Sequence, residues 1–83
     1  MNIHEPLITI LSRDRKRVVL LERGTLEVTK NLGGKDAKYA VVANNNEMIG
    51  SVLGAYAEEK EATDALEKLF AAIAAGEKTY IMN

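Results

Sequence analysis

Residues 56–76 read YAEEKEATDALEKLFAAIAAG, and this stretch decides the fold. Its apolar side chains recur every three or four residues, the spacing that places them on one side of an α-helix. Glutamates gather in the first turn, where the helix dipole favours negative charge, and Gly76 is suited to end the helix. The stretch therefore predicts one amphipathic helix whose apolar stripe covers a sheet. The stripe consists of Ala62, Ala65, Leu66, Leu69, Phe70 and Ile73.

The rest of the chain predicts short strands bounded by turn residues. Residues 18–21 form an unbroken apolar run after Arg17, which predicts a strand with little solvent on either face. Asn44, Asn45 and Asn46 separate two other runs, and asparagine tolerates the left-handed angles of a hairpin turn. The predicted strands span residues 7–11, 17–21, 25–30, 38–43 and 48–53 before the helix and 79–82 after it.

These elements predict an α+β fold in a single small domain, residues 1–83. We expect a curled, mostly antiparallel five- to six-stranded sheet packed on a single amphipathic helix, in the order β-β-β-β-β-α-β. A helix about 10–12 Å across covers only two or three strands that lie ~4.8 Å apart. The uncovered apolar area predicts a homodimer in addition to curling. The helix end that carries Ala71, Ala74 and Ala75 is a candidate interface, with high helix propensity as the alternative explanation.

Composition narrows the possible classes of protein. The 83 residues include no cysteine, so neither disulfides nor thiolate-bound zinc can support the small core. The longest apolar run, Leu69–Ala75, is far shorter than the ~20 residues that cross a membrane. The first residues lack the basic start and apolar core of a signal peptide. We therefore expect a cytoplasmic protein without a membrane partner.

Residues suited to catalysis are scarce. His4 is the sole histidine, and neither Ser12 nor Ser51 lies in a G-x-S-x-G context, so a Ser-His-acid site is not predicted. Gly33-Gly34-Lys35 lacks both the earlier glycine and the following Ser or Thr of a phosphate-binding loop. The acids of the predicted turns have no spacing typical of a metal site. The sequence predicts no enzyme, no cofactor and no metal.

A basic cluster at residues 13–17 is the polar feature most suggestive of binding. Arg13, Arg15, Lys16 and Arg17 surround a single acid, Asp14, in a predicted turn. Arginines bind phosphate through two parallel hydrogen bonds, so the cluster is a candidate contact for anions or nucleic acid. Against this, the net charge is −1 and no aromatic residues interleave the cluster. The alternative is a solvated turn whose charges protect a strand edge.

Two glycines mark a second feature. Gly50 and Gly54 lie four residues apart on one face of a predicted strand, and Tyr56 follows on that face. They would leave a shallow groove for a ligand or partner, or else admit close approach of the helix or mark bends where the strand curls.

A recurring pattern runs through most of the chain, namely Arg13-Asp14-Arg15, Arg17-Val18-Val19, Leu53-Gly54-Ala55-Tyr56, Ala62, Ala65-Leu66, Leu69, Ile73, Gly76 and Tyr80-Ile81-Met82. In these residues the chain resembles a group of short uncharacterised proteins of Gram-positive bacteria and their phages. Those proteins have several strands, an L-G-x-Y turn, one helix and an aromatic-x-Met ending. The resemblance implies the fold and the cytoplasmic setting, and the group carries no established activity. The chain departs from the group at Glu58, where a Ser or Thr helix cap is usual, and at Asn83, where proline is usual.

Taken together, these features predict a non-catalytic protein–protein interaction module that self-associates. The alternative is a small nucleic-acid-associated protein that binds through Arg13, Arg15, Lys16 and Arg17.

Overall fold

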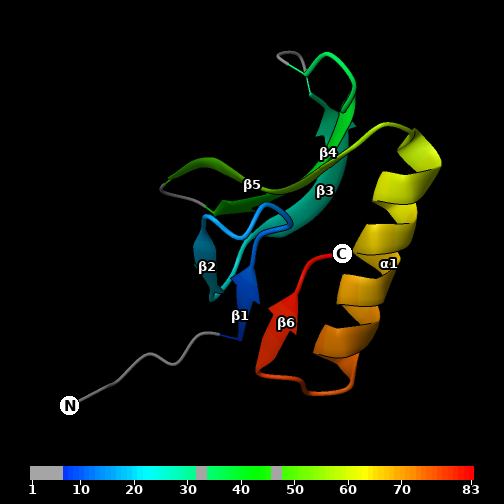
Figure 1. Ribbon diagram of the computed structural model, residues 1–83. Helices are drawn as coiled ribbons and strands as arrows, with labels where there is room; N and C mark the ends of the chain where they lie inside the picture. Colours follow the sequence, from blue (N-terminus) through cyan, green and yellow to red (C-terminus); the bar gives the residue numbers. More distant parts are fainter. Residues whose placement is uncertain (1–6, 32–33, 46–47) are drawn as a thin grey trace.

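The computed structural model describes residues 7–31, 34–45 and 48–83 and shows an α+β fold. Within these residues the chain forms six strands and one helix. Along the chain, the helix follows the fifth strand and precedes the sixth (Figure 1). This order confirms the predicted succession of elements. The elements are β1 (Ile8–Leu11), β2 (Val18–Leu21), β3 (Thr25–Lys30), β4 (Tyr39–Asn45), β5 (Met48–Tyr56), α1 (Glu59–Ala74) and β6 (Thr79–Ile81).

The strands form two three-stranded sheets, so the prediction of one curled sheet is wrong. In the first sheet, β1 lies in the middle, antiparallel to β2 and parallel to β6. The second sheet is an antiparallel meander, β3-β4-β5. The short turn after β2 directs β3 into the other sheet instead of pairing the two strands, and Gly24 in this turn has a φ of 128°, which favours glycine.

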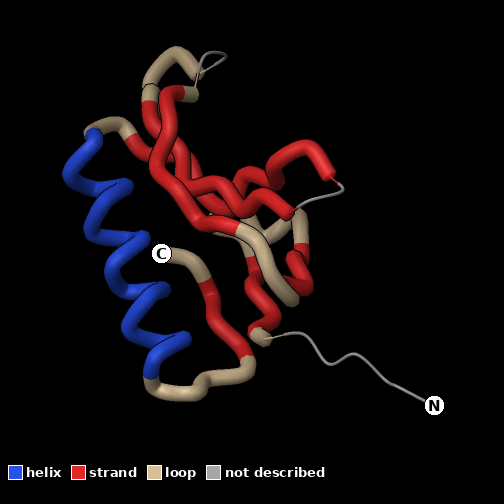
Figure 2. Tube along the Cα trace, turned by 180° about the vertical axis from the view of Figure 1, so that it is seen from behind, coloured by secondary structure: helices blue, strands red, loops and turns tan. Residues whose placement is uncertain are grey.

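The helix α1 covers the β3-β4-β5 sheet, and β6 lies between α1 and β1 (Figures 1 and 2). Ala62, Ala65 and Leu69 are buried, as the helical spacing predicts. Phe70 is 68% exposed, so its assignment to the covering stripe is wrong. At 100° per residue, Phe70 lies near the margin of the apolar stripe, where a helix that rests on only three short strands does not bury it.

Both ends of α1 are closed by local hydrogen bonds. The backbone N–H of Glu58 donates to the Glu61 carboxylate at 3.2 Å. This bond gives the N–H a partner at the helix N-terminus without a Ser or Thr cap. Gly76 has a φ of 80°, and its N–H donates to the Ile73 carbonyl while that of Glu77 donates to Ala72. These two bonds form a Schellman motif, which confirms Gly76 as the C-terminal cap.

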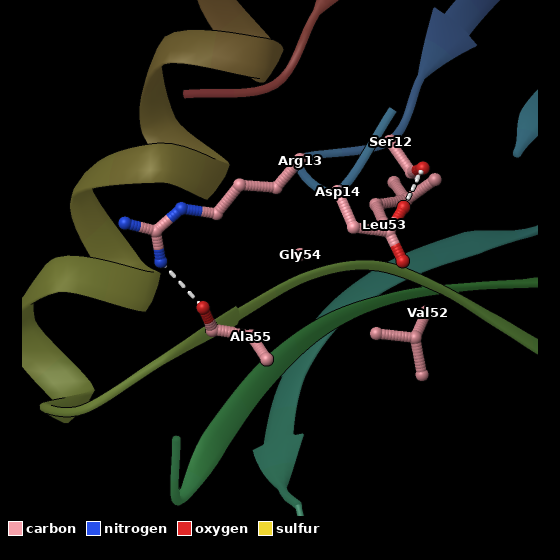
Figure 3. Close-up of a pocket in the computed structure, with 7 residues that line it drawn as sticks. All are labelled: Ser12, Arg13, Asp14, Val52, Leu53, Gly54 and Ala55. Carbon is pink, nitrogen blue, oxygen red and sulfur yellow. Dashed lines mark hydrogen bonds between the residues drawn. The ribbon is translucent and has the colours of Figure 1, made fainter. Parts of the chain in front are cut away.

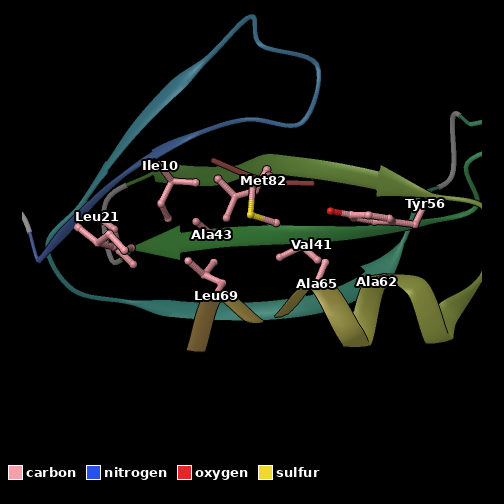
Figure 4. Packing of buried hydrophobic residues seen from close by; sticks show 11 residues of the cluster. Ile10, Leu21, Val41, Ala43, Tyr56, Ala62, Ala65, Leu69 and Met82 are labelled. Atoms are coloured by element: carbon pink, nitrogen blue, oxygen red, sulfur yellow. The ribbon is translucent and has the colours of Figure 1, made fainter. Parts of the chain in front are cut away.

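The core lies where the two sheets and the helix meet (Figure 4). β1 contributes Ile8 and Ile10, which alternate with outward-facing residues along the strand. Met82, just after β6, is fully buried near Ile10 and Val41, so the end of the chain belongs to the core. The other members of this cluster are Leu21, Ala43, Leu53, Tyr56, Ala62, Ala65 and Leu69.

A bulge in β5 joins the two sheets. Val41 pairs with Gly54 and Val42 pairs with Val52, so Leu53 has no partner on β4. The Leu53 carbonyl accepts a 2.7 Å hydrogen bond from the backbone N–H of Arg13, which follows β1. Leu53 itself is fully buried. The extra residue therefore directs the strand's carbonyl toward the other sheet and its side chain into the core.

Two expectations about turns have different outcomes. The hairpin between β4 and β5 is confirmed by their antiparallel pairing, but Asn44 and Asn45 belong to β4 rather than to the turn. Asn46, His4 and Gly33, also singled out in the sequence, lie outside the described residues. Within the described part of the chain, the one helix is too short and too polar to span a membrane.

Candidate interaction surface

The β2-β1-β6 sheet has one face in the core and one that is uncovered. The register pairs Thr9 with Leu20 and Thr79, and it pairs Leu11 with Val18 and Ile81, so these side chains share one face. We call this surface the outer face; it consists of Thr9, Leu11, Val18, Leu20, Thr79 and Ile81. Its other side carries the core residues Ile8 and Ile10.

The outer face is largely apolar, and its apolar side chains on the two flanking strands are exposed, while Thr9 and Leu11 on the central strand are half-buried. Val18 is 59% exposed, Leu20 65% and Ile81 53%. The six positions include no charged residue, whereas the exposed face of an antiparallel pair usually carries polar side chains. The prediction that the strand at residues 17–21 meets little solvent on either face is therefore wrong. Its unbroken apolar run indicates a strand whose second face is apolar without being covered by the described part of the same chain.

The basic turn between β1 and β2 is organised around Asp14. Its carboxylate accepts a 2.6 Å hydrogen bond from the Ser12 hydroxyl and a 2.9 Å bond from the Lys16 backbone N–H. Both bonds lower the pKa of Asp14, and the bond from Ser12 has the larger effect. Arg15 adopts a φ of 66° within this turn, and the side chains of Arg15, Lys16 and Arg17 are exposed. Asp14 thus shapes the turn and leaves three cations facing solvent.

Arg13 does not join the other three cations. Its guanidinium lies 4.3 Å from the centre of the Tyr56 ring and donates a hydrogen bond to the Ala55 carbonyl on β5 (Figure 3). The side chain therefore lies against the second sheet. A hollow of about 350 Å³ opens between this turn and β5. The structure thus separates the predicted basic cluster into a structural contact, Arg13, and an exposed group, Arg15, Lys16 and Arg17.

Tyr56 connects the end of β5 to the end of the chain. Its hydroxyl donates a 2.7 Å hydrogen bond to the backbone oxygen of Asn83, and the residue is only 3% exposed. Burial raises the pKa of Tyr56, partly offset by the positive charge of Arg13. Tyr56 is therefore held as a neutral phenol that both fills the core and donates a hydrogen bond.

This raised pKa predicts a stability that falls in alkali. The neutral form of Tyr56 is favoured in the folded state, so its contribution is complete below the unfolded pKa near 10 and is lost as pH rises through the higher folded pKa. We expect the free energy of unfolding to fall further between about pH 8 and about pH 11 in the wild type than in Tyr56→Phe. Urea titrations at both pH values measure this difference. Equal losses in the two proteins would contradict the assignment.

The alanine-rich end of α1 faces β6 over part of its surface. Ala71 and Ala75, with Ala72, line a shallow hollow of about 520 Å³ against β6. Ala74 is exposed and does not line this hollow. Two of the three predicted interface residues therefore lie beside Ile81, at the margin of the outer face, and the third points elsewhere.

Gly54 admits a close neighbour, but this neighbour is the Tyr56 side chain and not the predicted helix. A Cβ at this position would lie 2.8 Å from the Tyr56 hydroxyl, so Gly54 provides room for the Tyr56 ring. A Cβ on Gly50 would meet the Asn44 and Val42 side chains. These close contacts explain both glycines without a ligand groove.

Other chemistry finds little support in the described residues. Among residues 7–31, 34–45 and 48–83, no three histidine or carboxylate side chains converge as a metal site would require. One surface ion pair joins Lys60 to Asp64 at 3.5 Å within the described helix. Comparison with protein-family models, with curated proteins and with solved structures finds no match, so the resemblance to short proteins of Gram-positive bacteria and phages stays a prediction.

Proposed function

We propose that the protein is a cytoplasmic, non-catalytic protein–protein interaction module and that two copies associate through the outer face. The observation that carries this proposal is the exposure of Val18, Leu20 and Ile81 on a sheet face without charged residues. Burying such side chains stabilises an interface by about 25 cal/mol for each Å² removed from water. Exposed apolar patches of this kind are typical of interaction sites.

A second copy suits this face for three reasons. Two outer faces related by a twofold axis present the same apolar residues to each other, and sheets stack face to face about 10 Å apart. The net charge of −1 causes little repulsion between copies. The helix does not compete for this surface, because it covers the β3-β4-β5 sheet.

Nucleic-acid binding is less well supported. Arg13, one of its four predicted contacts, is occupied by Tyr56 and the Ala55 carbonyl. The three exposed cations that remain lie beside apolar side chains rather than aromatic stacking platforms.

Light scattering across a dilution series tests self-association. We expect the wild type to reach twice its 9.1 kDa mass and to keep that mass at high salt, because an apolar interface is screened little by ions. Leu20→Lys and Ile81→Lys should shift the population to monomer, since each places a charge in the apolar interface.

Phe70→Lys is the matched control. Phe70 is as exposed as Leu20 but lies on the helix that covers the other sheet, so this variant should keep the wild-type mass. Circular dichroism checks that all three variants remain folded. A wild type that is monomeric at every concentration, or a Phe70→Lys variant that dissociates as readily as Leu20→Lys, would refute association through the outer face.

A further inference from the structure

The strand β2 has a free edge. β2 pairs only with β1 in its sheet, and Ser12 N–H donates to the Arg17 carbonyl while Leu7 N–H donates to the Leu21 carbonyl. Because alternate residues of an antiparallel strand direct their backbone groups to opposite sides, Val18 and Leu20 direct theirs away from β1. Among the described residues, no other strand or loop forms backbone hydrogen bonds with this edge.

A groove runs along this free edge. It has a volume of about 250 Å³ and lies between β2 and the neighbouring parts of β4 and β5. Its walls are residues 17–21 on one side and Ala43, Asn44 and Ser51 on the other. The edge is thus open, and an extended segment laid beside β2 would also contact the second sheet.

The two faces of β2 differ in chemistry. Val18 and Leu20 point to the outer face and are more than half exposed. Arg17 has the opposite parity and lines the groove together with Val19 and Leu21, and the exposed Arg15 and Lys16 precede it. A segment added to this edge would therefore place one set of alternate side chains against Val18 and Leu20, and the other set against a wall that is cationic at Arg17 and apolar beyond it.

We propose that the free edge of β2 binds an extended acidic segment of a partner protein by strand addition. In this mode the backbone hydrogen bonds of Val18 and Leu20 provide affinity, and side-chain alternation provides specificity. The segment places apolar residues beside Val18 and Leu20 and carboxylates at the end of the groove that carries Arg17. The proposal goes beyond self-association, because the segment pairs with the backbone edge of β2, which adjoins the outer face but is not part of it.

Charge and shape favour a peptide over a nucleic acid. A strand edge offers backbone donors and acceptors that match another strand. The residues that form this edge, Val18 and Leu20, have aliphatic side chains. Phosphates would meet the three cations but would leave both the edge and the apolar side chains without partners. A second copy of β2 would bring the same cationic turn rather than an acidic strand.

The test uses the full chain and the synthetic peptide acetyl-EVEIEVE-amide, followed by titration calorimetry and by amide NMR. We expect saturable binding that weakens with salt and shifts the amide signals of Val18 and Leu20. Arg17→Glu should weaken binding at least about tenfold, because it replaces attraction by repulsion. The matched control Lys30→Glu reverses an exposed charge on β3 and should leave binding unchanged.

Three further probes separate strand addition from simple charge attraction. The permuted peptide acetyl-EEEEVIV-amide should bind more weakly, since it lacks alternation. N-methylation of one alternate set of amides should abolish binding while methylation of the other set spares it, because only one set faces β2. The Lys-substituted peptide acetyl-KVKIKVK-amide should not bind.

Equal binding of the alternating and permuted peptides would overturn the proposal, as would equal effects of the two methylation patterns. So would failure of the alternating peptide to bind, or binding of a fifteen-residue oligothymidylate in its place at the same residues. Light scattering of Arg17→Glu keeps the two proposals apart: its mass should equal that of the wild type. If the wild type is monomeric and binds the peptide, only the self-association proposal is refuted. If it is dimeric and does not bind the peptide, only the strand-addition proposal is refuted.

Discussion

Replacing Met82 with alanine is expected to lower the free energy of unfolding by about 2–5 kcal/mol, the usual cost of truncating a buried Met or Leu side chain. Met82 is fully buried near Ile10 and Val41, and its N–H donates a 3.0 Å hydrogen bond to the Leu11 carbonyl. A domain of this size has a total stability of only about 4–12 kcal/mol. The variant should therefore be partly unfolded at moderate temperature, as urea denaturation followed by circular dichroism will measure.

Two other variants test the cause of this loss. Met82→Leu keeps most of the volume and should cost less than about 1.5 kcal/mol. Phe70→Ala removes a larger apolar side chain from an exposed position of α1 and should change stability by about 0.5 kcal/mol. If Met82→Ala were no more destabilising than Phe70→Ala, the chain after β6 would not belong to the core.

Replacing Gly54 with alanine is expected to cost about 1–3 kcal/mol, as overpacking of a core usually does. The new Cβ would lie 2.8 Å from the Tyr56 hydroxyl and 3.0 Å from its Cε2 atom. The ring has little freedom to move, because Arg13 covers it and Asn83 holds its hydroxyl. The strand conformation of Gly54 is open to alanine, so the loss comes from the contact and not from the backbone.

A double-mutant cycle isolates this contact. In a Tyr56→Phe background the hydroxyl nearest to the new Cβ is absent and the bond to Asn83 no longer holds the ring. Gly54→Ala should therefore cost less in that background than in the wild type. Gly76→Ala is a useful contrast, because its Cβ meets no neighbour while its φ of 80° disfavours alanine; its cost should be the same in both backgrounds. Strict additivity at Gly54 would show that the Tyr56 hydroxyl is not the obstacle.

The local elements of this protein follow from the sequence. The helix and the strand β3 are predicted with useful accuracy, because the 3.6-residue and two-residue periods are properties of contiguous residues. Gly76 ends the helix for a local reason as well, since glycine adopts positive φ at little cost. The excess of apolar strand surface over what one helix covers also follows from the sequence, and it led to the outer face as the proposed interface.

The candidate site follows only in part. Arg15, Lys16 and Arg17 are exposed in a turn as expected, but nothing in the local pattern indicates that Arg13 turns toward Tyr56, 43 positions later along the chain. The outer face includes Val18 and Leu20, which belong to an unbroken apolar run. Such a run predicts a strand that is buried on both faces, yet both side chains are exposed. Sequence spacing cannot distinguish a face covered by the same chain from one left for a partner.

The sequence by itself determined where the helix lies and where it stops, and it narrowed the number of strands to five or six, because hydrogen bonding, side-chain period and capping act over a few residues. Tertiary structure alone decided how the strands divide into two sheets and which faces stay uncovered. Ile10 pairs with Tyr80, and the bulged Leu53 accepts a hydrogen bond from Arg13. Such contacts are determined by the packing of the whole chain. Any apolar strand can pair with several others until the helix and the last residues pack against them.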